Sequence, residues 1–455
     1  MTTTLTDVQQ RAADPAETFL ARVADRTLRV GVIGMGYVGL PLAHAFHDRG
    51  FPVLGFDVDP GKVAELNAGR SYIRHFAHAT IAAMRETERF AATADFDRLP
   101  EVDAVLVCVP TPLSAHREPD MSYVEATTGQ IARRLRAGQL VVFESTTYPG
   151  TTDDVIRPAL EATGLASERD YFLAYSPERE DPGNPDFSCA RIPKVVGGDG
   201  PRASRLAEAL YAPVVNGVVP VADTRTAEAV KLTENIFRSV NIALVNELKQ
   251  IYAAMDIDVW KVIDAAKTKP FGFMPFYPGP GLGGHCIPID PFYLTWKARE
   301  VAMPTRFIEL AGEINTAMPG HVVARVAESL NDRFARALNG ACILLVGLAY
   351  KKNVDDIRES PSFRLIELLE AKGARVDVHD PFVAVIPETR EHPTLAGRTG
   401  VALDDATVGG YDAVVIATDH DDADYAVLDR AARLIVDTRN VMARNGLSSE
   451  RVVKA

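Results

Sequence analysis

Apolar residues in this chain gather in short runs that end at glycine, proline or acidic residues. The run 29–33 ends in a glycine-rich turn, 34–39, and a stretch with helical spacing follows. A second run, 52–56, then closes on Asp57. A strand, a helix and a second strand in this order are typical of a βαβ unit.

Two later runs, 102–109 and 140–146, are mostly apolar. Such runs are typical of strands in a parallel sheet that is covered on both faces by helices. A weaker copy of the pattern follows near the C-terminus, where 341–346, 373–381 and 411–418 resemble the corresponding parts of the first lobe. We therefore expect two Rossmann-like domains.

Between the two lobes, residues 222–255 have apolar positions at helical spacing and contain no glycine or proline. This pattern predicts one helix of about 45 Å, long enough to join two α/β lobes and form part of a dimer contact; two shorter helices are the alternative. The predicted fold is α/β, with two Rossmann-like parallel-sheet domains joined by a long central helix and a helical middle domain. The expected divisions are a polar leader helix (1–28), the first Rossmann domain (29–221), the helical domain (222–335) and the second Rossmann-like domain (336–455).

Composition narrows the class of protein. A chain of 455 residues with 47% hydrophobic and 24% charged residues predicts a globular protein of two or three domains. The net charge of −12 argues against a nucleic-acid partner, and no apolar run is long enough to predict a membrane span. The polar N-terminus favours a cytoplasmic location. The four cysteines, Cys108, Cys189, Cys286 and Cys342, lack CxxC spacing, which predicts reduced thiols.

The glycine-rich turn predicts a dinucleotide site. Gly34, Gly36 and Gly39 follow a strand and open a helix, so the backbone can approach a pyrophosphate at the helix N-terminus. Asp57 can accept hydrogen bonds from the adenosine ribose and would repel a 2′-phosphate, which favours NAD over NADP. Lys62 either reaches the same ribose or is a solvated helix residue. The alternative for the turn is a glycine cluster with no ligand.

The segment 279–290 sets Cys286 among glycines and prolines, which exclude helix and strand and leave the thiol approachable. A nicotinamide beside a nucleophilic sulfur indicates an oxidation through a covalent intermediate. We expect Cys108 and Cys342 to be small buried hydrophobic residues in strands, and Cys189 to be inert. The neighbouring His285 has no second Cys or His pair at ligand spacing, so no metal site is expected.

Three further positions can carry chemistry. Lys231 and Asn235 share one face of the long helix and can hold an oxyanion, although a helical lysine is usually solvated. Glu178, in a loop after an aromatic-rich strand, brings a carboxylate to the same cleft or is merely solvated. The second lobe lacks the triple glycine and carries cations for a phosphorylated ligand: Lys351, Lys352, Arg358 and Arg439. Surface salt bridges with Asp355 and Asp356 are the alternative.

These motifs resemble the UDP-glucose/GDP-mannose dehydrogenase family, the four-electron NAD-dependent nucleotide-sugar 6-dehydrogenases, from about residue 29 to residue 439. The most specific pieces are 283–290, 228–235 and 351–361. The sequence Ser176-Pro177-Glu178-Arg179 and the segment 144–150 look like the N-acetylhexosamine branch, most of all its UDP-N-acetylglucosamine enzymes.

The resemblance implies roles for individual residues. Cys286 would be the nucleophile, Lys231 and Asn235 the oxyanion stabilisers, Asp290 the residue that positions water, and Glu178 an acid/base group. The implied NAD site comprises Gly34, Met35, Gly36, Tyr37, Val38, Gly39, Asp57, Lys62, Thr111, Thr146 and Arg358. The implied UDP-sugar site comprises Glu178, Arg179, Lys231, Asn235, Phe276, Tyr277, Gly279, Gly283, Lys351 and Arg439.

The expected reaction is therefore the oxidation of the C6 hydroxyl of a UDP-N-acetylhexosamine to the uronic acid by a homodimer or higher homo-oligomer. UDP-N-acetylglucosamine is favoured, with UDP-N-acetylmannosamine, UDP-N-acetylgalactosamine and UDP-glucose as alternatives. A two-electron β-hydroxyacid dehydrogenase would share the first lobe but leaves Cys286 unexplained. A non-catalytic nucleotide-sugar sensor would not need the nucleophile, the lysine and the acid.

Overall fold

A computed structural model of the chain describes residues 14–73, 76–114, 118–179, 191–284, 286–389, 392–447 and 449–455. Cys189, His285 and part of the expected leader lie outside these residues. The chain forms two compact units, Met1–Leu232 and Thr233–Ala455, and each is described by itself.

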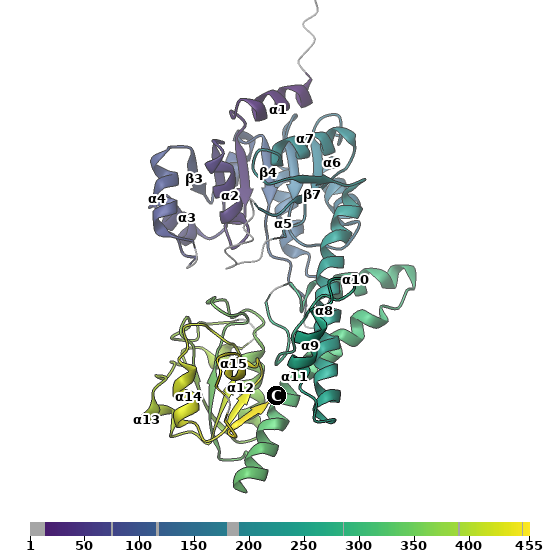
Figure 1. Ribbon diagram of the computed structural model, residues 1–455. Helices are drawn as coiled ribbons and strands as arrows, with labels where there is room; N and C mark the ends of the chain where they lie inside the picture. Colours follow the sequence, from purple (N-terminus) through teal and green to yellow (C-terminus); the bar gives the residue numbers. More distant parts are fainter. Residues whose placement is uncertain are drawn as a thin grey trace, which may run out of the picture. The chain divides into compact units, whose positions relative to one another are not determined.

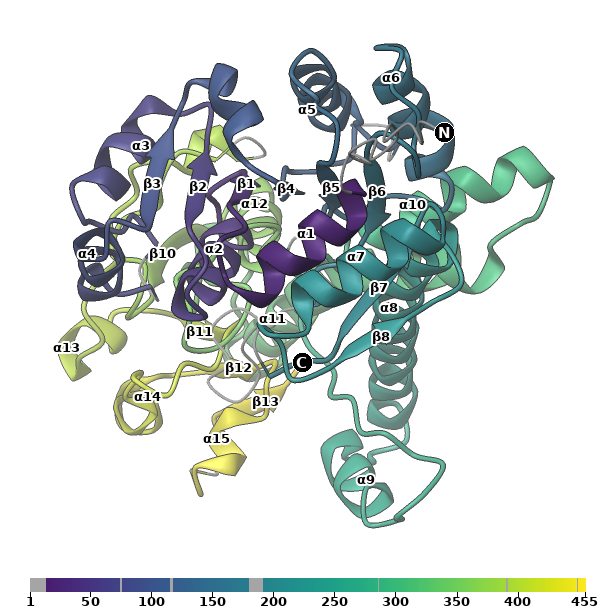
Figure 2. The same ribbon diagram turned by 90° about the horizontal axis from the view of Figure 1, so that it is seen from above.

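The first unit is built on one sheet (Figure 1), with the strand order β3-β2-β1-β4-β5-β6-β7-β8 (Figure 2). Its strands are β1 (Val30–Ile33), β2 (Val53–Phe56), β3 (Phe90–Thr93), β4 (Ala104–Val107), β5 (Leu140–Phe143), β6 (Phe172–Tyr175), β7 (Lys194–Gly198) and β8 (Val218–Pro220). All pairs are parallel except β6 with β7. The predicted parallel strands β1, β2, β4 and β5 are confirmed.

Helices cover both faces of this sheet, and alternate residues of one strand enter different cores. Val30 and Val32 of β1 join the core that contains Phe19, Phe46 and Leu206 from three helices, whereas Ile33 joins the core on the other face. The helices are α1 (Pro15–Ala24), α2 (Gly39–Asp48), α3 (Pro60–Asn67), α4 (His78–Glu86), α5 (Ser122–Ala132), α6 (Arg157–Glu161) and α7 (Pro201–Tyr211). Burial on both faces explains why the strands are apolar at consecutive positions.

Helix α1 follows the outside of the first unit and packs on α7 (Figure 2). Asp14 caps its first turn, and Pro15 occupies the first helical position. Ion pairs join it to the domain, including Arg205–Glu17 at 2.7 Å and Arg22–Asp103 at 2.6 Å. The leader helix expected before residue 29 is therefore present within the described residues.

The long helix α8 spans Thr224–Ala253 without interruption. The prediction of one helix rather than two is confirmed, because no glycine or proline interrupts its hydrogen bonds. The boundary between the two compact units falls within α8, after Leu232.

The second unit holds a smaller, wholly parallel sheet with the order β10-β9-β11-β12-β13. Its strands are β9 (Cys342–Val346), β10 (Arg375–His379), β11 (Ala413–Ile416), β12 (Ile435–Asp437) and β13 (Val452–Lys454). The remaining α-helices are α9 (Val259–Ala266), α10 (Asp290–Ala298), α11 (Arg306–Phe334), α12 (Pro361–Ala371), α13 (Asp405–Val408), α14 (Tyr425–Ala431) and α15 (Val441–Arg444). The predicted second Rossmann-like lobe is confirmed.

The same hydrogen-bonding arrangement occurs in both sheets. Asp57, after β2, accepts a hydrogen bond from the backbone N–H of Met35 at 3.0 Å. Asp380, after β10, accepts from the N–H groups of Leu348 at 2.6 Å and Ala349 at 3.0 Å. In each sheet, a carboxylate at the end of one strand thus fixes the turn that follows the neighbouring strand.

Candidate active site

The glycine-rich turn lies where the strand order of the first sheet reverses, after β1 and between the ends of β2 and β4. Crevices at such positions are the usual ligand sites of open parallel sheets. Gly39 begins α2 and Val38 precedes it as the N-cap, so the helix N-terminus faces the turn. Thr111 and Thr146 follow β4 and β5 at the same edge, and the side chain of Thr111 is buried.

The three glycines have different roles. Gly34 has φ +90°, and a Cβ there would lie 2.4 Å from the carbonyl oxygen of Cys108. A Cβ on Gly39 would lie 1.9 Å from the carbonyl oxygen of Gly34. Both glycines are therefore required by the fold. A Cβ on Gly36 would meet nothing within 4 Å, so this glycine leaves a free approach for a ligand.

Asp57 is buried beside this turn. Its Oδ2 accepts from Met35 N and its Oδ1 from Asp59 N, both at 3.0 Å. The ammonium of Lys62 lies 3.7 Å from Oδ2, which favours its position at the ribose end of the site over the solvated alternative. The hydroxyl of Tyr72 donates to the carbonyl of Met35. The turn, the helix N-terminus and the carboxylate fit NAD, which supplies a hydride acceptor when it is bound.

Lys231 and Glu178 meet at the end of the first unit. Lys231, on α8, is buried, and its Nζ lies 3.8 Å from Oε2 of Glu178. The alternative of a solvated side chain is therefore wrong for both residues, because the side chains of Lys231 and Glu178 are only 6% and 14% exposed. The guanidinium of Arg179 donates to the carbonyl of Pro193 at 2.7 Å, which directs it along its own loop.

Glu228 anchors this part of α8, and sequence reasoning assigned it no role. Its carboxylate accepts hydrogen bonds from Gly150 N at 2.6 Å and from the N–H and hydroxyl of Thr152 at 2.9 and 2.7 Å. Burial raises the pKa of Glu228 to about 7. The signal in the sequence was an acid three residues before Lys231, on the same face of the helix.

In the second unit, Asn235 and Asp290 form a buried polar pair. The side-chain amide of Asn235 donates to Oδ2 of Asp290 at 2.6 Å, and both side chains are almost fully buried. Asp290 begins α10, and its backbone N–H donates to the carbonyl of Cys286 at 2.8 Å. The nucleophile candidate thus lies one turn before Asp290, in the loop that the sequence predicted, and it is half-buried.

The glycine loop before Cys286 packs tightly. Gly279 N donates to Oδ1 of Asn246 at 3.0 Å, and a Cβ on Gly279 would lie 2.5 Å from the guanidinium of Arg439. A Cβ on Gly283 would lie 2.6 Å from Tyr350. The structure therefore brings Gly279 to Arg439, as expected for residues of one substrate site. Asn246, buried on α8, was missed because a single helical asparagine carries no motif.

Phe276 and Tyr277 lie in a different environment from the other expected sugar-loop residues. Phe276 packs edge to face on Phe237 with ring centroids 5.7 Å apart. The Tyr277 hydroxyl donates to Asp264 at 2.8 Å and receives a hydrogen bond from Lys267 at 3.1 Å. Within the second unit, these contacts hold the two aromatic residues against α8 and α9.

Of the four expected cations in the second lobe, Arg358 and Lys352 form ion pairs with acids, whereas Arg439 and Lys351 are described by their burial. Arg358 forms a forked pair with Asp356, with N–O distances of 2.6 to 3.1 Å, and Lys352 pairs with Asp421 at 2.9 Å. The salt-bridge alternative thus holds for Arg358, and the partner of Lys352 is an acid other than the two expected. Arg439 donates from Nε to the carbonyl of Ala417 at 2.9 Å, and burial lowers its pKa. Lys351 is half-buried.

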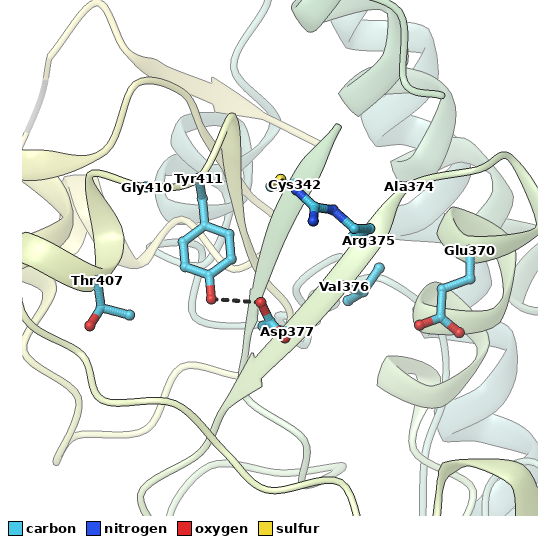
Figure 3. A pocket seen from close by; sticks show the side chains of 9 residues that line it. All are labelled: Cys342, Glu370, Ala374, Arg375, Val376, Asp377, Thr407, Gly410 and Tyr411. Carbon is cyan, nitrogen blue, oxygen red and sulfur yellow. Dashed lines mark hydrogen bonds between the residues drawn. The ribbon is translucent and has the colours of Figure 1, made fainter. Parts of the chain in front are cut away.

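The expectation that Cys108 and Cys342 are buried is wrong, since both are half-buried. Cys342 begins β9 and lines a groove of about 680 Å³ together with Arg375, Asp377 and Tyr411 (Figure 3). Arg375 donates to its Sγ at 2.7 Å, and the Tyr411 hydroxyl donates to Asp377 at 2.9 Å. This groove lies where β9 and β10 begin, the opposite edge from Arg439, and contains none of the expected site residues.

Among the described residues, no group of three or more His, Cys, Asp or Glu side chains could hold a metal ion. In the same part of the chain, no helix is both long and apolar enough to cross a membrane.

Comparison with known proteins matches three successive segments of the chain. They match the NAD binding domain (28–215), the central domain (225–317) and the UDP binding domain (344–444) of the UDP-glucose/GDP-mannose dehydrogenase family. The chain belongs to this family. It is therefore an NAD-dependent oxidoreductase, a nucleotide-sugar 6-dehydrogenase with a UDP-sugar substrate.

Individual relatives are similar to this chain along most of its length. It is 36% identical to UDP-N-acetyl-D-glucosamine 6-dehydrogenase of Pseudomonas aeruginosa, over 87% of this chain and 91% of the relative. It is 38% identical to UDP-N-acetyl-D-mannosamine dehydrogenase of Salmonella typhi, over 90% of this chain and 98% of the relative. The structure of UDP-D-ManNAc dehydrogenase from Pyrococcus horikoshii superposes with a TM-score of 0.83 at 32% identity, covering 94% of this chain and 97% of that one.

Proposed function

We propose that this dehydrogenase oxidises C6 of UDP-N-acetylglucosamine to the carboxylate, in two steps that use two NAD molecules and the thiol of Cys286. The observation that carries the proposal is the buried pair of Asn235 and Asp290, placed one turn after Cys286. An amide donor and a carboxylate next to a thiol are the groups that a thiohemiacetal and a later hydrolysis require.

The proposed roles follow the reaction. Gly36, Asp57 and the N-terminus of α2 would hold NAD, which would supply the hydride acceptor for both oxidations. In the first, Lys231 and Glu178 receive and relay the proton of the C6 hydroxyl, which leaves a bound aldehyde.

The thiolate of Cys286 then adds to the aldehyde carbon, and Lys231 and Asn235 stabilise the resulting oxyanion. Loss of the second hydride converts this thiohemiacetal to a thioester. Asp290, oriented by Asn235, positions the water that cleaves the carbon–sulfur bond, releasing the uronate and the thiol.

The substrate-binding and remaining cofactor residues are proposed from the same family pattern. Lys351 and Arg439 would hold the UDP group, with Gly279 and Gly283 in the loop over the sugar. Phe276 and Tyr277 would shape that loop, and Arg179 would contact the substrate. Met35, Tyr37, Val38, Thr111, Thr146 and Arg358 would line the cofactor site.

The choice of sugar rests on the motifs Ser176-Pro177-Glu178-Arg179 and 144–150 and on the relative from Pseudomonas aeruginosa. A hydroxyl or acetamido orientation is read by few contacts, and the relative from Salmonella typhi acts on the mannosamine epimer. UDP-N-acetylmannosamine is therefore the second candidate.

A substrate panel tests this proposal. UDP-N-acetylglucosamine, UDP-N-acetylmannosamine, UDP-N-acetylgalactosamine and UDP-glucose are supplied at equal concentration, and NADH is measured spectrophotometrically. We expect the largest kcat/KM for the first and two NADH for each sugar consumed. One NADH per sugar would contradict the covalent route, and a preference for another epimer would overturn only the choice of sugar.

Replacing the thiol tests the nucleophile. Cys286→Ser should bind substrate and cofactor but fail to complete the second oxidation, whereas Cys108→Ser should retain full turnover. Two NADH per sugar at the native rate from Cys286→Ser would exclude the covalent step.

The proposal extends to the domain limits of the chain. We propose functional divisions at 29–221, 222–335 and 336–455, preceded by a leader, 1–28.

The chain would form a homodimer through α8 and the loop after α9, where apolar side chains of Phe237, Leu244, Phe271 and Met274 are exposed around a groove of about 800 Å³. A cytoplasmic location suits a cysteine that must stay reduced. Light scattering of the full chain would measure the oligomeric state.

A further inference from the structure

A buried lysine in the second unit stands outside the proposed catalytic groups. Lys249 lies on α8 and is 4% exposed. Among the described residues, its ammonium has no hydrogen-bond partner. One turn earlier, the buried amide of Asn246 donates to Oδ1 of Asn315 at 2.9 Å, so a buried polar group on this helix normally has a partner. A buried, unpaired ammonium is strongly unfavourable, which indicates that a counter-ion belongs beside it.

Lys249 lines a cavity of about 360 Å³. The cavity is formed by the end of α8, the turn into α9, α11 and β13, all within the second unit. Arg325 and Arg333 of α11 and Lys454 of β13 also line it. Four cations from three different elements therefore surround one small space.

Two acids, Asp256 and Asp258, also line the cavity. Asp258 pairs with Lys454 at 2.6 Å, and Asp437 accepts hydrogen bonds from the backbone N–H groups of Arg439 and Met442, each at 2.9 Å. Arg325 pairs with Glu328 at 3.0 Å at a half-exposed position. These contacts leave the charge of Lys249 without a carboxylate in hydrogen-bond contact.

The local field is positive. Burial, together with the neighbouring charge of Arg439, lowers the pKa of Lys249 to about 7, and Asp437 acts in the opposite direction. Burial also lowers the pKa of His321 to about 4, assisted by the charges of Lys249 and Arg325. An anion in the cavity would offset the mutual repulsion of these groups.

We propose that this cavity is a binding site for a phosphate group, with Lys249 donating at its floor and Arg325 and Arg333 reaching it from α11. A phosphate offers more acceptor oxygens than a carboxylate and so can serve several cationic donors at once. The site is separate from the residues proposed for NAD and for the UDP-sugar, although the charge of Arg439, a proposed substrate residue, lowers the pKa of Lys249.

The test measures thermal unfolding of the full-length protein as phosphate replaces chloride at constant ionic strength. Saturating UDP is present throughout, so that the proposed diphosphate residues are already occupied. A ligand that binds the folded state raises Tm in a saturable way. We expect this rise in the native protein, and we expect the half-saturating phosphate concentration to increase at least ~tenfold in Lys249→Met.

The matched control is Lys372→Met, which removes an exposed lysine just after α12 in the same unit. It should respond to phosphate as the native protein does. Absence of a saturable rise in the native protein, or an equal response in Lys249→Met and Lys372→Met, would overturn the proposal. If Lys249→Met does not fold, Arg325→Gln replaces it, and an unchanged phosphate response there would be the contradicting result.

A second titration distinguishes a phosphate monoester from free inorganic phosphate as the ligand. Glucose 6-phosphate is titrated in place of inorganic phosphate. Half-saturation at a lower concentration than for inorganic phosphate would assign the site to a phosphate monoester, and half-saturation at an equal or higher concentration would assign it to the free ion. Because UDP-sugar oxidation is not measured, failure of the proposed function would leave this result unaffected.

Discussion

The side chain of Asn235 on α8 donates a 2.6 Å hydrogen bond to Asp290, the first residue of α10. The pair is buried, so the hydrogen bond between the two side chains helps to fix the orientation of both. In the proposed reaction, this contact aims the carboxylate that positions water and holds the amide that stabilises the oxyanion.

Asn235→Ala should lower kcat by roughly 10²- to 10³-fold, because an oxyanion donor and the orientation of Asp290 are lost together. Stability should fall by about 1–3 kcal/mol, since a buried carboxylate loses a donor. Steady-state kinetics and chemical denaturation measure the two effects. The control is Asn241→Ala on the same helix, where the amide of Asn241 donates to the carbonyl of Phe237 at 2.7 Å. Equal activity of the two variants would remove Asn235 from the mechanism.

The glycine-rich turn allows cofactor binding to be separated from folding. Gly36→Ala should fold with an unchanged Tm, because its Cβ meets no protein atom, yet raise KM for NAD at least ~tenfold by blocking the pyrophosphate. Gly39→Ala should unfold the first unit, since its Cβ would overlap the carbonyl oxygen of Gly34. Thermal melts with and without NAD distinguish the two. A native KM in Gly36→Ala would place the pyrophosphate elsewhere.

Asp57 should control the choice between NAD and NADP. Asp57→Asn removes the charge that repels a 2′-phosphate, and the ratio of kcat/KM for NAD to that for NADP should fall by ~10- to 100-fold. Lys62, 3.7 Å away, would then be available to the phosphate. Glu65→Gln, a change at a half-exposed position on the same helix as Lys62, should leave the ratio unaltered. An unchanged ratio in Asp57→Asn would show that another group reads the ribose.

Lys249 should make stability depend on pH in phosphate-free buffer. Its pKa is about 7 in the folded protein against 10.5 for an ordinary lysine, so between these values the unfolded chain holds the extra proton. Stability therefore rises with pH across this window, by ~1.4 kcal/mol for each unit of pKa difference at most, and the full cost is present below pH 7.

In Lys249→Met this rise should disappear. Urea denaturation of the native protein and of the variant, from about pH 6 to 10, measures it. The charges of Arg439 and Asp437 act on Lys249, Lys249 in turn acts on His321, and all three neighbours are kept in the variant. An identical pH dependence in both proteins would contradict the burial of a titrating ammonium.

The sequence predicted the parallel strands in the centres of both sheets, because burial on two faces leaves uninterrupted apolar runs such as 104–107 and 342–346. It did not reveal β8, a strand of three residues with two exposed positions, because an edge strand that is half solvated has no such run. The uninterrupted α8 was predictable from the absence of glycine and proline.

The candidate site was predicted as a set of residues and not as a set of contacts. Helical spacing puts Lys231 and Asn235 on one face, but nothing local links Asn235 to Asp290, 55 residues further on. Lys249 and Glu228 were missed for a related reason. A lone charged residue on a helix is usually solvated, and only tertiary packing decides that these two are buried.

The continuity of helix α8 limits where two such enzymes can be joined to make a chimera. The boundary between the two compact units falls after Leu232, so it separates Lys231 from Asn235 inside a continuous helix and not at an exposed linker. A hybrid made from two relatives by joining them at that boundary would inherit its lysine from one parent and its asparagine from the other. Successful chimeras should therefore take α8 whole from a single parent.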